Sequence, residues 1–153
     1  MNWTELKNSI YYVDGSWRDI YVKDTTIEDW QKWVKHVNSN FRLTWFNGKT
    51  KKIQSQIDFD MIKEYWSGGH EVISPAEIFL GEIKIKVHFF DHDEFENDFD
   101  PRTIKSVEDH QVLISFLKAV SKALAKPVIL TPENGQQHVL IHVNSDEVTM
   151  QFL

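Results

Sequence analysis

Carboxylates gather in one short segment of this chain. Between positions 91 and 100 there are six acidic residues and no Lys or Arg, namely Asp91, Asp93, Glu94, Glu96, Asp98 and Asp100. Their combined charge equals the formal net charge of the whole chain, −6 at pH 7, so the remainder is balanced. Concentrated charge steers association with partners of opposite sign and suppresses wrong partners. The segment therefore predicts a docking surface for a basic protein, with the acidic outer face of an edge strand as the alternative.

The same segment offers oxygen ligands for a cation. Asp91, Asp93 and Glu96 carry the hard oxygens that Ca²⁺ and Mg²⁺ prefer. An EF-hand loop also needs a Gly at its sixth position and a bidentate Glu at its twelfth, and the segment has neither. We therefore predict no metal site and no cofactor.

Histidines occur in two pairs with a spacing of four residues. His88 and His92 flank the start of the acidic segment, beside Asp91, and His138 and His142 lie near the C-terminus. In an extended strand four residues span about 13 Å, which is too far for one metal ion to bridge. Neither pair lies in an H-E-x-x-H motif. A small metal-dependent hydrolase built on His88, His92 and Asp91 is kept as an alternative function.

Sequence motifs of nucleophilic and phosphate-binding enzymes are missing. The chain has no G-x-S-x-G, no G-x-x-x-x-G-K and no G-x-G-x-x-G. It also has no Cys, which excludes a thiol nucleophile, a thiolate metal site and a disulfide. The sequence favours a non-catalytic protein over an enzyme, although an active site assembled from dispersed residues is set by geometry and stays open.

The acidic segment is expected to form one strand of a hairpin. Residues 82–89 alternate strictly between polar and apolar types, which predicts a strand with one buried face. The alternation resumes after a turn at residues 91–93, with Phe95 and Phe99 on one side and the acids of residues 94–100 on the other. We expect the second strand to be acidic on its outer face.

Further strands are indicated by turn signals. Asp14-Gly15 stands between IYYV and WRDIYV, and Asn47-Gly48 stands between FRLTWF and KTKKI, so each predicts a hairpin. The runs VILT, HVLIHV and VTMQF after residue 127 predict two or three final strands. The expected sheet has about six to eight strands, and residues 67–76 are expected to form a loop.

Capping residues and helical periodicity predict the helices. Thr25 or Thr26 begins a helix over about 26–38, and Ser106 with Asp109 begins a long one over about 106–125. A short helix is expected over DFDMIKEYW, capped by Asp58 or Asp60, and residues 2–9 are left open between a helix and an extended chain. The fold class is α+β, with a mostly antiparallel sheet built from hairpins and the two larger helices packed on it.

Composition limits the choice of partner and compartment. The 153 residues, 41% of them hydrophobic, suit a single α+β domain over 1–153. The sequence pI near 5.6 disfavours nucleic acid and anionic lipid as partners. No window approaches the roughly 20 apolar residues of a membrane helix, and MNWTELKNSIYY has no basic start followed by an apolar run, so we expect neither a membrane span nor a secretory leader. We expect a soluble cytoplasmic protein that does not contact a membrane.

One long run of the chain resembles a known family. FENDFDPRTIKSVEDHQVLISFLKAVSKALAKPVILTPENG carries an acidic D-x-D-P ahead of a capped helix and then K-P-V-I-L-T-P-E-N. Over roughly residues 95–135 it is similar to small bacterial immunity proteins of polymorphic-toxin and contact-dependent-inhibition systems. The resemblance implies an acidic, non-catalytic protein that plugs or covers a cognate toxin.

These observations combine into one functional prediction. We expect an immunity protein, a monomer or homodimer, that neutralises a basic toxin domain such as a nuclease. A structural or oligomerisation module is a further alternative. Aromatic residues opposite the buried faces serve as interface anchors. The predicted partner-binding residues are Asp91, Asp93, Glu94, Glu96, Asp98, Asp100, Phe90, Tyr12 and Tyr21.

Overall fold

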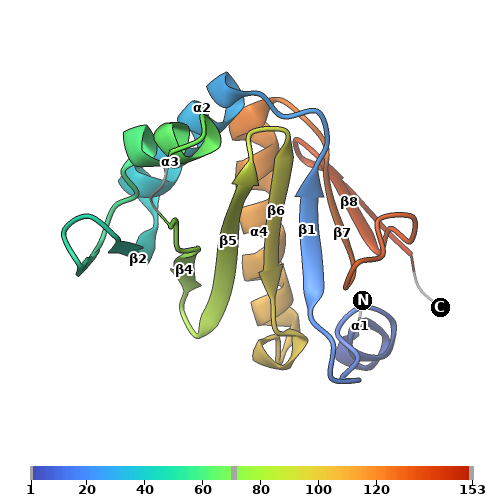
Figure 1. Ribbon diagram of the computed structural model, residues 1–153. Coiled ribbons are helices and arrows are strands. Elements are labelled where there is room, and N and C mark those ends of the chain that lie inside the picture. Colours follow the sequence, from blue (N-terminus) through green and yellow to red (C-terminus); the bar gives the residue numbers. More distant parts are fainter. Residues whose placement is uncertain (1, 70–71, 152–153) are drawn as a thin grey trace.

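Nine antiparallel strands form the centre of the protein, in a computed structural model that describes residues 2–69 and 72–151. The strand order is β3-β2-β4-β5-β6-β1-β7-β8-β9 (Figure 1). The strands are β1 Arg18–Val22, β2 Arg42–Asn47, β3 Lys52–Gln54, β4 Ala76–Leu80, β5 Ile83–Asp91, β6 Glu94–Phe99, β7 Val128–Pro132, β8 Ile141–Asn144 and β9 Glu147–Met150. The predicted fold class, α+β with an antiparallel sheet, is confirmed.

Helices pack against this sheet. They are α1 Trp3–Ser9, α2 Ile27–Asn40, α3 Phe59–Trp66 and α4 Val107–Leu124, with a short 3₁₀ helix at Pro101–Thr103. Figure 1 shows α4 running behind the sheet along its strands, where it covers one of the two faces. The face of the sheet turned toward the viewer carries no helix over β5, β6 and β1, and we call it the open face.

Local capping explains where the two larger helices begin. The Thr26 hydroxyl accepts a hydrogen bond from the Asp29 N–H at 3.1 Å, and the Asp29 carboxylate accepts one from the Thr26 N–H at 3.0 Å. The Ser106 hydroxyl accepts from the Asp109 N–H at 3.1 Å. These bonds satisfy backbone donors that a helix leaves free at its first turn. Both predicted helix starts are confirmed.

Aromatic side chains fill the space between the sheet and the helices. Trp33 of α2 contacts Phe95 of β6 and Phe116 of α4, with ring centroids 6.0 and 5.7 Å apart. Trp30 is fully buried, and its indole N–H donates to the carbonyl of His92 at 2.8 Å. This bond joins α2 to the turn between β5 and β6. The core thus fixes the hairpin that carries the acidic residues.

The acidic strand is internal and not at an edge. β6 pairs with β5 on one side and with β1 on the other, and the edges of the sheet are β3 and β9. Protection of an exposed edge therefore does not explain the acids of β6, and that alternative is wrong. Because β1 lies beside β6, its outward side chains join those of β6 on the open face.

Two sequence predictions about strands are also wrong. Residues 10–13 form no strand. The Arg18 guanidinium bonds two of their carbonyls instead: its Nε donates to the Ile10 carbonyl at 2.7 Å and its Nη2 donates to the Tyr12 carbonyl. The Asp14–Gly15 turn therefore makes no hairpin. The strand β4, next to the predicted loop, was not expected, so the sheet has nine strands instead of six to eight.

Candidate functional site

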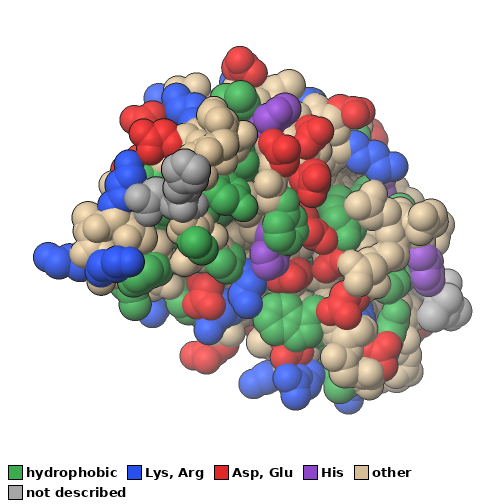
Figure 2. Space-filling view, in the orientation of Figure 1, with side chains coloured by type: hydrophobic (Ala, Val, Ile, Leu, Met, Phe, Trp, Pro, Cys, Tyr) green, Lys and Arg blue, Asp and Glu red, His purple; other side chains and the backbone are tan. Residues whose placement is uncertain are grey.

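Carboxylates from two neighbouring strands meet on the open face. Along β6, Phe95 and Phe99 are buried while Glu96 and Asp98 are partly exposed, as the predicted alternation requires. On β1, Asp19 lies directly opposite Asp98, and Tyr21 lies opposite Glu96. Figure 2 shows acidic side chains crowded over the middle of this face, with hydrophobic and histidine side chains among them.

Asp19 is the most deeply buried of these acids. It is 3% exposed, and its Oδ2 accepts hydrogen bonds from the Tyr21 hydroxyl and from the Asn134 N–H, both at 2.8 Å. Burial raises the pKa of Asp19 above its ordinary value even though both hydrogen bonds favour the charged form. Burial and the nearby carboxylates also raise the pKa of Tyr21. These contacts tie the loop after β7 to β1.

Asp98 and Glu96 form the second part of the cluster. The His88 ring lies 3.0 Å from Asp98 Oδ2 through its Nε2, and it stacks on Phe90 with centroids 4.9 Å apart. The other oxygen of Asp98, Oδ1, is buried without a hydrogen-bond partner. Burial raises the pKa of Glu96, and the charges of Asp19 and Asp98 act in the same direction. The cluster therefore has fewer hydrogen-bond donors and cations than its carboxylates could bind.

An acidic hollow of about 460 Å³ adjoins this cluster. Its walls come from the end of β1, from the β5–β6 hairpin and from the loop after β7. Four carboxylates and a single ammonium group line it, belonging to Asp24, Asp93, Glu94, Glu96 and Lys23. Such a hollow attracts cationic groups, because like charges held together raise the local negative potential.

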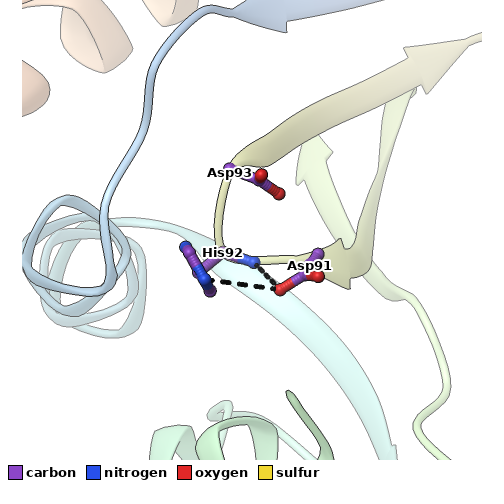
Figure 3. A group of neighbouring side chains, drawn as sticks. All are labelled: Asp91, His92 and Asp93. Carbon is purple, nitrogen blue, oxygen red and sulfur yellow. Dashed lines mark hydrogen bonds and ion pairs between the residues drawn. The ribbon is translucent and has the colours of Figure 1, made fainter.

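The tip of the hairpin holds the group of side chains drawn in Figure 3, Asp91, His92 and Asp93. One potential ligand atom from each lies within 4.8 Å of the other two. Asp91 accepts the backbone N–H of His92 at 2.7 Å and lies 3.8 Å from its ring Nε2, whereas no interaction is drawn from Asp93 to either (Figure 3). All three are partly or fully exposed. The hydrolase alternative is built on His88, His92 and Asp91. Only His92 and Asp91 belong to this group, because His88 is paired with Asp98.

The predicted acidic partner-binding residues do not all lie on the same part of the surface. Glu94, Glu96 and Asp98 point from β6 on the open face, with Asp91 and Asp93 at its turn. Asp100 follows β6 and is held by Arg102, whose Nη2 donates to Asp100 Oδ2 at 2.7 Å.

The three predicted aromatic anchors also differ. Phe90 is 51% exposed. Tyr12 is half-buried, with the Arg18 guanidinium 4.0 Å from its ring centroid. Tyr21 is only 8% exposed and serves the Asp19 network.

Four site residues were missed by sequence reasoning. Asp19 and Asp24 bring acids from β1 and its end, while Asn134 and Gln136 bring amides from the loop after β7. The alternation in WRDIYV places Asp19 and Tyr21 on one side of a strand. It does not show that this strand pairs with β6, which is about 80 residues away, and so the shared surface was not predictable.

Comparison with protein-family models, with curated proteins and with solved structures gave no match. Within residues 2–69 and 72–151, no helix has the length and apolar character needed to cross a membrane.

Proposed function

We propose that this protein is a non-catalytic binding protein, and more specifically an immunity protein that covers a basic toxin domain with its open face. The acidic hollow carries the proposal. Asp24, Asp93, Glu94 and Glu96 come from two segments far apart in the sequence and surround one space. A cationic side chain of a partner would meet all four carboxylates there.

Electrostatics supports a protein partner with clustered Lys and Arg. The six acids of residues 91–100 carry a charge equal to the net charge of the whole chain, −6, and five of them lie in the hairpin between β5 and β6. At physiological ionic strength the Debye length is about 8 Å, so charges that line one hollow act together on an approaching partner. Complementary fields of this kind raise association rates by factors of 10 or more, in a salt-dependent way.

Burial makes the surface rigid as well as charged. The strand that carries Glu96 and Asp98 is paired on both sides, and its inward residues Phe95 and Phe99 are 1% and 0% exposed. Acids fixed on such a strand need little ordering when a partner binds, so less conformational entropy is lost. Phe90 adds an exposed aromatic ring beside them.

The experiment is a capture of partners from the source cell with the tagged protein at low and high salt. A variant with Asp93→Asn, Glu94→Gln and Glu96→Gln removes three charges from the hollow. A matched control, with Glu5, Glu28 and Glu108 changed to Gln, removes three exposed charges from helices. A basic partner retained by the wild type and control, but lost by the hollow variant and at high salt, would support the proposal.

Immunity requires a second readout. The captured partner is expressed alone and together with the protein in a heterologous host, and colony formation is counted. The proposal expects the partner alone to be toxic, the wild type to restore growth, and the hollow variant to restore less. Equal capture by both variants, or no toxicity of the partner, would refute it. Bound metal in a protein that captures nothing would instead favour the hydrolase alternative, now centred on Asp91 and His92.

A further inference from the structure

We propose that the open face is a docking surface for one protein partner and carries charges of both signs. Its acidic half binds a basic segment of the partner, and a cationic half binds an acidic segment beside it. The inference rests on the proposed function, since it describes the same partner more fully. The cationic half lies on β2, β4 and β5, and its defining residues are Arg42, Lys84 and Lys86.

Strand register places the cationic half in a row across the sheet. Arg42 of β2 lies opposite Phe79 of β4, and Phe79 lies opposite Lys84 of β5. The Arg42 guanidinium is 4.9 Å and the Lys84 ammonium 5.7 Å from the centroid of the Phe79 ring. One ring therefore holds two cations against the sheet. Arg42 is exposed, and the Lys84 side chain is 50% exposed, so a partner can reach both side chains.

Lys86 marks the boundary between the two halves. It lies opposite Asp98 in the register, and its ammonium is 5.3 Å from the centroid of the Trp17 ring. Beyond this line toward β1, the charged side chains of the open face are the acids Asp98, Glu96 and Asp19. On the other side Glu77 is the acid within the cationic row, and it is paired with Lys84 at 3.5 Å.

Only the outer ends of the two halves are far enough apart to act separately, because Lys86 and Asp98 are neighbours at the boundary. Arg42 on β2 and Asp19 on β1 are separated by four strand spacings, which is about 19 Å at the usual distance between neighbouring strands. That exceeds the Debye length of about 8 Å at physiological ionic strength. A partner that is basic throughout would be repelled by Arg42 and Lys84 wherever it extended past β5. The charge pattern fits a protein surface on which a basic patch adjoins an acidic one.

The test uses two defined probes, an oligo-arginine peptide and an oligo-glutamate peptide, each titrated into the isotope-labelled full chain at low salt. Backbone amide shifts report where each peptide binds. We expect oligo-arginine to perturb β6, the end of β1 and the loop after β7. We expect oligo-glutamate to perturb β2, β4 and the first half of β5. Oligo-glutamate that binds on the helices, or does not saturate, would overturn the inference.

Substitutions make the outcome specific. Arg42→Gln with Lys84→Gln should weaken oligo-glutamate binding about fivefold or more and leave oligo-arginine binding within twofold, given the usual strength of exposed charge pairs. Lys122→Gln, on α4 and paired with Asp146 at 2.7 Å, removes one paired cation as Lys84→Gln does; it is the control matched to that single variant and should change neither. Lys84→Gln alone is the milder variant if the double one unfolds.

The two proposals fail in different ways. Oligo-arginine that does not localise on β6 and β1 would remove support for the proposed function itself. Oligo-arginine on β6 and β1, together with oligo-glutamate elsewhere, would leave that function standing and reject only the cationic half.

Discussion

A buried histidine should make the stability of this protein sensitive to mild acid. His110 lies in the first turn of α4, is 3% exposed, and has its Nδ1 2.5 Å from the hydroxyl of Tyr11. Burial lowers the pKa of His110 to about 4, because a charged imidazole would lose its hydration there. The positive end of the helix dipole disfavours the charged form as well.

The sign of the effect follows from proton binding by the two states. In the unfolded chain a histidine titrates near 6.5, so between pH 6.5 and about 4 the unfolded state holds the extra proton. Stability attributable to His110 is therefore complete above pH 6.5 and falls as the pH drops toward 4. Linkage gives a loss of about 2.5 kcal/mol between pH 7.5 and 4.5.

The assay is urea unfolding at a series of pH values, for the wild type and for His110→Gln. Glutamine keeps a polar group that can bond to Tyr11 but does not titrate. The carboxylates titrate in both proteins, so the difference between the two curves isolates His110. We expect the wild type to lose about 2.5 kcal/mol more than the variant over this range. Parallel curves would show that His110 is not held neutral by the fold, and would refute the reasoning.

Three further substitutions test the packing and the charges. Asn97 is fully buried with neither amide atom bonded, so Asn97→Val should raise the free energy of unfolding by about 1–3 kcal/mol in urea titrations; a decrease would contradict this. Trp33→Ala should lower it by about 3–5 kcal/mol, because the ring packs between α4 and β6; a loss below 1 kcal/mol would contradict that packing. Asp19→Asn should raise the thermal midpoint at pH 7. Because burial raises the pKa of Asp19, the gain should shrink toward pH 4, and a gain independent of pH would count against it.

The parts of the fold that sequence could predict are those with local causes. The α4 boundaries follow from a hydroxyl cap at Ser106 and from a stop near Pro127, where Ala125 adopts φ 53°. The Asn47-Gly48 hairpin likewise depends on a turn and two adjacent strands. Each of these signals lies within a few residues of the structure it specifies, which is why it could be read from the sequence.

The candidate site depends on contacts between distant residues. Asp19 meets Asp98 only because β1 enters the sheet between β6 and β7. Nothing local in WRDIYV specifies those neighbours. The absent hairpin at Asp14-Gly15 also involves a side chain further along the chain, since Arg18 donates to the carbonyls of Ile10 and Tyr12. The acidic character of the site was predictable, and its shape was not.

The buried carboxylates of the open face lower the stability of the free protein, and a cationic partner would reduce that cost. Asp19 and Glu96 both have pKa values raised by burial, and Asp98 has an oxygen without a donor. At neutral pH these groups oppose folding, so a chain selected for stability alone would replace them. A cation brought by a partner to Glu96, which lines the hollow, would offset part of this cost. A carboxylate that destabilises the free protein would then strengthen the proposed complex, which favours a proposed interface here over the Asp100–Arg102 pair, whose charges are already matched.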